Sequence, residues 1–184
     1  MDESYLPSVK KQFEYYKLLG DKTFAQLTTD QFFLFSSKNE NSIATITKHI
    51  AGNMLSRWTH FLTEDGEKEW RNRDDEFINS FTTKEEVITY WEIGWKCLFD
   101  ALNNINTQNA NTIVYIRNQG HTITEAINRQ LCHYSYHIGQ IVFLGKFLTA
   151  DKWQTLSVAK GTSKEYNTEK FSKEKTRKHF TEDL

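Results

Sequence analysis

Proline, glycine and cysteine are all scarce in this sequence of 184 residues, which contains one proline, eight glycines and two cysteines. Proline breaks helices and glycine weakens them, so their scarcity favours long uninterrupted helices and an all-α fold. The two cysteines, Cys97 and Cys132, lack the paired spacing of a disulfide framework. We therefore expect both to be reduced thiols in a cytoplasmic protein.

An excess of one charge and a long apolar run are also missing. The formal net charge is −1, which gives no overall attraction to nucleic acid or to an anionic membrane. No segment reaches the roughly 20 apolar residues that a membrane span needs, and the acidic start at Asp2 and Glu3 is not typical of a signal peptide. The composition therefore predicts neither a nucleic-acid partner nor a membrane partner.

Helical periodicity is what the sequence has in abundance. Hydrophobic residues make up 38% of the chain, enough for the core of one domain. They recur at steps of three and four in four segments, which predicts helices at residues 5–27, 42–62, 83–105 and 124–149. Residues 112–122 have strand-like composition followed by a turn, which predicts a short hairpin before the fourth helix. We expect a domain at residues 1–160 and a polar C-terminal tail at residues 161–184, either wrapped around the domain or disordered.

Two connections between the predicted helices differ in character. Residues 38–42 form a short polar turn before the second helix, whereas residues 63–77 form a long loop of mixed charge. This loop exceeds the usual helix–helix connection of about 2–8 residues. Loops of this length are often functional, but a solvated loop with Trp70 tucked beneath it is the simpler alternative.

Two histidines, His133 and His137, lie four residues apart in the fourth predicted helix. Positions i and i+4 share one helix face, so both imidazoles can point at one ion. The alternative is two separate histidines, each with its own hydrogen bond. Tyr134 follows His133 where a zinc protease of the H-E-x-x-H type has its glutamate, so that chemistry is not expected.

A third ligand could come from several places in the chain. His49 lies with Asn53 on the flank of the apolar stripe of the second predicted helix. His60 lies near the end of that helix and His121 precedes the fourth, so both are expected at the surface. From the residues alone, however, all three histidines remain open as the third ligand.

The histidine-bearing stretches resemble the DinB-like superfamily, also described as DinB/YfiT-like metalloenzymes. The resemblance rests on TKHIAGNM at residues 47–54 and on residues 125–140, which begin with EAI and end with HYSYHIGQ. DGE at residues 65–67 and WRNRD at residues 70–74 are similar to an uncharacterised, domain-of-unknown-function branch. Over roughly residues 3–160, the resemblance implies a four-helix bundle of DinB-like type. It also implies a divalent metal ion bound by His49, His133 and His137.

The resemblance further implies a kind of chemistry. Three imidazoles leave one position of a tetrahedral ion open, as in catalytic zinc sites, and nitrogen ligands suit zinc or nickel. Superfamily relatives include thiol-dependent S-transferases and a thiol-dependent isomerase. This implies a metal-dependent transferase or hydrolase whose partner is a small-molecule thiol or another small substrate, although no catalytic residue is identified. Four residues could support the ligands or touch a substrate, with plain core or surface roles as the alternative: Asn53, Tyr134, Tyr136 and Gln140.

The sequence also allows a second function of a different class. The metal could support only the fold of a helical bundle that acts through a protein partner. An open coordination position beside a cleft would favour the enzyme, and a sealed metal would favour the bundle. We also expect a homodimer, because the resemblance and a surplus of large aromatic residues suggest one: Trp70, Trp91, Trp95 and Trp153.

Overall fold

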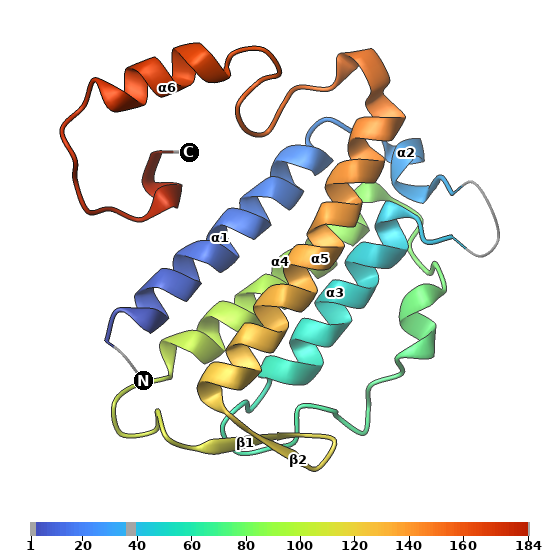
Figure 1. Ribbon diagram of the computed structural model, residues 1–184. Helices are drawn as coiled ribbons and strands as arrows, with labels where there is room; N and C mark the ends of the chain where they lie inside the picture. Colours follow the sequence, from blue (N-terminus) through green and yellow to red (C-terminus); the bar gives the residue numbers. More distant parts are fainter. Residues whose placement is uncertain (1–2, 36–39, 184) are drawn as a thin grey trace.

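Four long helices lie side by side in the structure, a computed structural model that describes residues 3–35 and 40–183 (Figure 1). Each helix packs against two others, so that α1 and α3 both lie against α4 and α5. The helix that carries His49 therefore lies against the helix that carries His133 and His137, as a metal site shared by the three residues requires. The four helices are α1 (Tyr5–Phe24), α3 (Ile43–Trp58), α4 (Lys84–Asn103) and α5 (Ile123–Thr149).

Shorter elements complete the fold, and they make it mostly helical rather than strictly all-α. The predicted hairpin is confirmed as an antiparallel pair, β1 (Ile113–Ile116) and β2 (Gln119–Thr122), directly before α5. The remaining elements are two helices, α2 (Thr29–Phe33) and α6 (Ser163–Phe171), and three 3₁₀ helices, η1 (Asp74–Phe77), η2 (Ala150–Lys152) and η3 (Phe180–Asp183). None of the helices among the described residues has both the length and the apolarity of a membrane span.

The helix starts follow from local capping chemistry. Ser42 accepts a hydrogen bond from the backbone N–H of Thr45 at the start of α3. Thr83 and Thr122 each form a capping box with a glutamate three residues later, which satisfies backbone N–H groups that no helical carbonyl can reach. The predicted polar turn at residues 38–42 lies partly outside the described residues, and its last residue, Ser42, is the cap of α3.

The ends of the first and second long helices were predicted too late in the chain. α1 ends at Phe24 and α3 ends at Trp58, whereas the periodicity predicted helix to residues 27 and 62. After Trp58 the backbone turns away through His60, which has a positive φ of 48°. Apolar residues beyond this turn still pack inward, and this is why the apolar pattern outlasts the helix.

The core between the long helices is built from large aromatic side chains. Trp91 and Trp95 are fully buried there, and Gly94 lets α4 approach α3, because a Cβ at Gly94 would lie 2.9 Å from the Cα of Ala51. The burial of both tryptophans removes them as a reason to expect a dimer. Trp70 is 61% exposed and does not tuck under its loop as expected.

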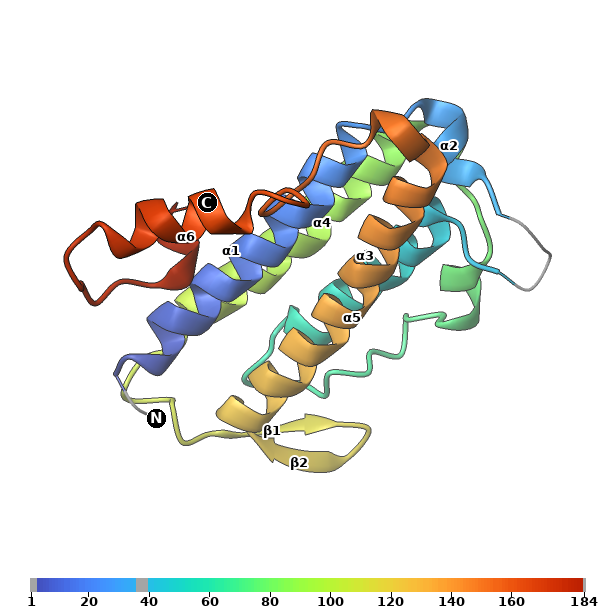
Figure 2. The same ribbon diagram turned by 45° about the horizontal axis from the view of Figure 1, so that its top comes forward.

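The C-terminal tail returns to the long helices. Figure 2 shows that α6 and the segment after it lie on the side of α1. The ring of Phe180 in η3 meets Tyr15 of α1 edge to face at 5.5 Å between centroids, and Lys11 pairs with Glu182. Of the two alternatives considered, the wrapping arm therefore describes the arrangement of this tail.

Candidate metal centre

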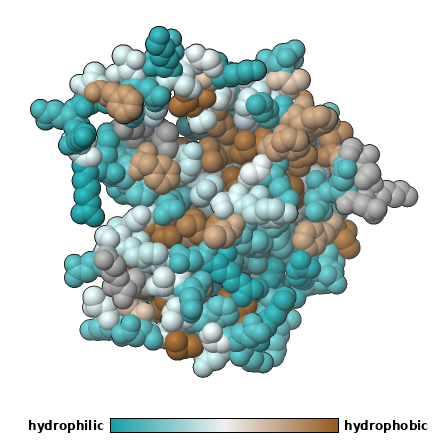
Figure 3. All heavy atoms as spheres, in the orientation of Figure 1, coloured by the Kyte–Doolittle hydropathy of each residue, from teal (hydrophilic) through white to brown (hydrophobic). Residues whose placement is uncertain are grey.

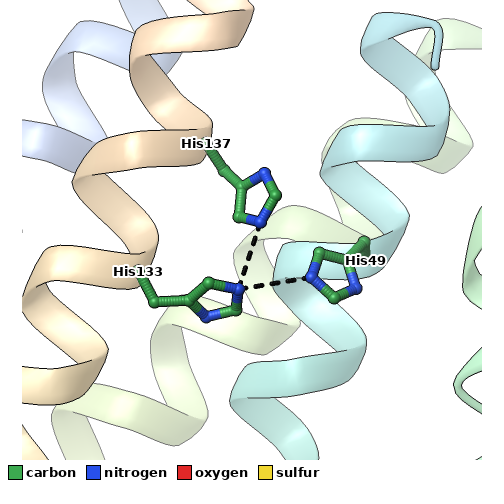
Figure 4. Close-up of side chains that lie close together, drawn as sticks. All are labelled: His49, His133 and His137. Atoms are coloured by element: carbon green, nitrogen blue, oxygen red, sulfur yellow. Dashed lines mark hydrogen bonds between the residues drawn. The ribbon is translucent and has the colours of Figure 1, made fainter. Parts of the chain in front are cut away.

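Three imidazoles converge between α3 and α5, as Figure 4 shows. The Nε2 atom of His133 lies 3.3 Å from Nε2 of His49 and 3.1 Å from Nε2 of His137. Tetrahedral zinc with bonds of about 2.0–2.1 Å would separate its nitrogen ligands by about 3.3 Å. One ligand atom from each histidine lies within 4.8 Å of the others, so the cluster could hold one divalent ion. These are the three histidines that the family resemblance implied.

The other ring nitrogens fix which nitrogen faces the centre. Nδ1 of His49 lies 2.8 Å from Oε2 of Glu76, and a carboxylate can only accept, so Nδ1 carries the hydrogen. Nδ1 of His137 likewise lies 2.8 Å from the amide oxygen of Gln140, with the amide oriented as in the structure. In the neutral rings both Nε2 atoms then point a lone pair at the centre. Metal-binding histidines are oriented in this way in proteins.

Glu76 reaches His49 from η1, and Arg71 holds it there. Arg71 donates from Nε to Oε1 at 2.8 Å and from its terminal nitrogen to Oε2 at 2.9 Å. Burial would raise the pKa of Glu76, but the hydrogen bonds from His49 and Arg71 outweigh it and lower the pKa below its usual range. Gly52 makes room for this contact, since a Cβ there would lie 2.7 Å from Oε1.

Sequence reasoning missed Glu76 because nothing in the charged loop marks one acid out from its neighbours. The alternative of a simply solvated loop is wrong, since Lys68 and Glu76 are both buried. The loop carries an ion-pair network in which Arg71 joins Glu76 to Glu67. The sequence does contain one signal, Gly52, three residues after His49. A glycine at this position lets another segment of the chain approach this face of α3 closely.

The histidines of α5 are held in their neutral form. Burial, followed by the neighbouring His137 and His49, lowers the pKa of His133 to about 3. Burial also lowers the pKa of His137, although the hydrogen bond that His137 donates to Gln140 opposes the shift. Because metals bind neutral imidazole, these two rings are ready to act as ligands at neutral pH.

The remaining candidate residues have separate positions. Tyr134 is fully buried, where its hydroxyl donates to Oδ1 of Asn53 and accepts from the indole of Trp58, both at 3.0 Å. Tyr134 therefore orients Asn53, while Asn53 itself lines a cavity beside the histidines. Gln140 supports His137, as described above. Tyr136 is 63% exposed, and its ring lies edge to face with the ring of His137 at 4.9 Å between centroids.

The other two candidate third ligands lie outside the cluster. The imidazole of His60 is exposed and faces Glu64, and His121 of β2 bonds to the carbonyl of Gln119. Both cysteines are free, as predicted. Cys132 is exposed, and Cys97 is half-buried with a pKa that burial raises.

A cavity of about 310 Å³ reaches the three histidines and also Asn53 and Phe77. The ring of Phe77 stacks on His49 at 4.7 Å between centroids and covers one side of it. A larger cavity of about 490 Å³, lined by His60 and Cys97 among others, lies elsewhere between α3 and α4 and contains none of the three histidines. The smaller cavity is therefore the one that matters for chemistry at the cluster.

Fold and site together define a mostly helical protein with a three-histidine cluster that could hold a divalent metal ion. A family model described as "Protein of unknown function (DUF1572)" matches residues 1–162, so the chain belongs to this family. No curated protein and no solved structure matched the chain.

Proposed function

We propose that this protein is a metal-dependent enzyme with a four-helix bundle of DinB-like type, and that His49, His133 and His137 bind one divalent ion. The observation that carries the proposal is the convergence of three Nε2 atoms while Glu76 and Gln140 hold the outer nitrogens of two rings. Isolated core histidines need only one partner each. Histidines whose Nε2 atoms point at one position, and whose Nδ1 atoms are hydrogen-bonded to other residues, are typical of metal ligands.

Zinc or nickel fits the site better than magnesium, because all three ligands are imidazole nitrogens. Three protein ligands leave a coordination position open, and the cavity of about 310 Å³ gives a small molecule access to it. When bound, such an ion would activate a water molecule or a thiol by lowering its pKa. This access favours the enzyme over the alternative of a metal that only supports the fold.

The residues around the cavity favour a thiol or water that comes from solution. Both oxygens of Glu76 are engaged by His49 and Arg71, so Glu76 positions His49 and is not free to take up a proton from a substrate. Neither Cys97 nor Cys132 is among the described residues that line the cavity. The thiol that we propose is therefore a small molecule from solution and not a cysteine of the chain, and thiol-dependent S-transfer or hydrolysis is the reaction class that we propose.

Cobalt substitution tests this proposal, because the d–d spectrum of cobalt reports on its ligands. Wild-type protein loaded with cobalt should show a four-coordinate spectrum that changes when a small thiol such as 2-mercaptoethanol is added. The His133→Ala variant should lose the cobalt spectrum, and the exposed His60→Ala variant should keep it. An unchanged spectrum on thiol addition, together with a large loss of thermal stability on metal removal, would support the purely structural metal instead.

A further inference from the structure

Five arginines line the cavity beside the histidines, and of these only Arg71 supports the three-histidine cluster, through Glu76. Their side chains come from α3, the loop before η1, the β1–β2 turn and α5, segments that lie far apart in the sequence. None of the described residues that line the cavity is acidic. The five arginines are Arg57, Arg71, Arg73, Arg117 and Arg129.

Two of these arginines belong to the framework. Arg57 donates to the carbonyl of Gly66 and to Glu67, and Arg71 bridges Glu67 and Glu76. Both side chains are almost wholly buried. A buried guanidinium needs a paired carboxylate, and Glu67 and Glu76 balance the two charges, although Nε of Arg57 has no partner among the described residues. Arg57 and Arg71 therefore form a neutralised base beneath the cavity.

The other three arginines face solvent with no carboxylate of their own. Arg73 lies over the ring of Phe77 at 5.2 Å and pairs with no acid among the described residues. Arg129 lies 3.2 Å from Nε2 of His121 and pairs with no acid among the described residues. Arg117 lies 3.3 Å from Glu67, whose oxygens Arg57 and Arg71 already share.

Three positive charges are therefore left over around one small cavity. Like charges repel, and walls of low dielectric strengthen their field, so the cavity attracts anions from solution. The whole chain is nearly neutral, with a net charge of −1, so this excess is local. A bound anion would remove the repulsion and would complete the hydrogen bonds of the guanidinium groups.

The backbone around Arg117 supports a functional placement. Arg117 and Asn118 form the two-residue turn of the hairpin with φ of 54° and 60°, and Asp65 accepts both of their N–H groups at 2.8 Å. Turns with two positive φ values favour Asn-Gly, and an arginine is strained there because its Cβ crowds the following carbonyl oxygen. An arginine at this strained position is better explained by what its side chain binds than by the turn.

We propose that this cavity binds the oxyanion of a small substrate, a carboxylate or a phosphate, through Arg73, Arg117 and Arg129. The proposal rests on the proposed function, since it names the substrate class of the same site. A guanidinium fork matches two oxygens of either group. The volume of about 310 Å³ lies at the lower end of ligand pockets, so the substrate is a small molecule. The three guanidiniums hold its anionic end while its reactive part lies at the histidines.

Calorimetric titration of the protein with inorganic phosphate and with succinate tests this proposal. Both the metal-free and the zinc-loaded protein are titrated, at low ionic strength. Each of the variants Arg73→Gln and Arg129→Gln should bind the preferred anion at least about tenfold more weakly, as expected for a lost charged hydrogen bond. Arg177→Gln is the matched control, because it removes the same charge from an exposed position in the C-terminal tail and should leave binding unchanged.

The outcomes separate this proposal from the metal centre. Binding of phosphate or of succinate to metal-free protein, weakened in Arg73→Gln and Arg129→Gln but not in Arg177→Gln, supports it even if the protein takes up no zinc. Preference for one probe identifies the anionic group. Failure of both probes to bind, or binding that needs zinc and is equal in all four proteins, overturns it and leaves the three-histidine site intact. Circular dichroism confirms that the exposed substitutions leave the helices folded.

Discussion

Replacing Glu76 with glutamine should weaken the metal centre without removing a ligand. One carboxylate oxygen accepts from His49, and both accept from Arg71. A glutamine of the same shape has one oxygen and one NH₂ group, so a donor must face either the His49 Nδ1–H or the Arg71 guanidinium. In the first case the His49 ring loses the hydrogen bond that turns its Nε2 lone pair towards the centre.

The size of the effect follows from burial and from the contacts that remain. Loss of a group that orients a metal-binding histidine commonly lowers metal affinity about 10–100-fold, or about 1.4–2.8 kcal/mol. Breaking a buried ion pair costs about 3–5 kcal/mol, but Arg71 keeps Glu67 as a second partner at 3.2 Å. We therefore expect the free energy of unfolding of metal-free Glu76→Gln to fall by roughly 2–4 kcal/mol.

Zinc competition against a chromophoric chelator measures the zinc affinity, and urea unfolding of metal-free protein measures the free energy of unfolding. Glu67→Gln is the matched control, since Glu67 pairs with Arg57 and Arg71 but contacts no histidine. It should lower stability and leave zinc affinity within about twofold of the wild type. Equal zinc affinity in wild type, Glu76→Gln and Glu67→Gln would refute the supporting role assigned to Glu76.

Three further predictions concern packing, pH and assembly. Gly52→Ala places a Cβ 2.7 Å from the supporting carboxylate and should weaken zinc binding about tenfold in the same competition assay; Gly139→Ala, where a Cβ meets nothing within 4 Å, should not weaken it. Burial lowers the pKa of His133 to about 3, so the unfolded chain, with a pKa near 6.5, takes up this proton first. Metal-free protein should therefore lose stability as pH falls from about 6.5 towards 3, by less in His133→Gln, and an equal pH dependence of urea unfolding in both would be contrary to this. We propose a homodimer through the outer face of α5, where Phe143 and Phe147 are exposed and apolar side chains gather (Figure 3). In analytical ultracentrifugation the double variant Phe143→Ser/Phe147→Ser should sediment as a monomer. A wild-type protein that is monomeric at micromolar concentration would exclude the dimer.

The sequence predicts the parts of this site that local periodicity controls. His133 and His137 are four residues apart on one helix, so their shared face follows from helix geometry alone. Capping residues such as Thr83 and Thr122 mark the helix starts in the same local way. The position of His49 depends on how α3 packs against α5, and it was therefore predicted only with the help of the family resemblance.

The rest of the site depends on irregular backbone, which has no period to follow. Glu76 and Arg71 meet through a loop, and the contact exists only because Gly52 leaves space on a helix that precedes both in the chain. Arg117 and Arg129 join the same cavity through the geometry of the hairpin and of α5. The tryptophans of α4 suggest a dimer when only the composition is considered, but they lie in the core. Composition counts large aromatic residues without distinguishing buried from exposed ones.

Metal content tests the central claim most directly. The protein is purified without added metal, exchanged into metal-free buffer with one equivalent of zinc, passed through a desalting column and measured by inductively coupled plasma mass spectrometry. Wild type and the exposed-histidine control His60→Ala should each retain about one ion per chain, and His133→Ala and His137→Ala should retain almost none. Wild-type protein that retains no zinc, nickel or cobalt, or His133→Ala and His137→Ala variants that retain as much as the wild type, would contradict the account.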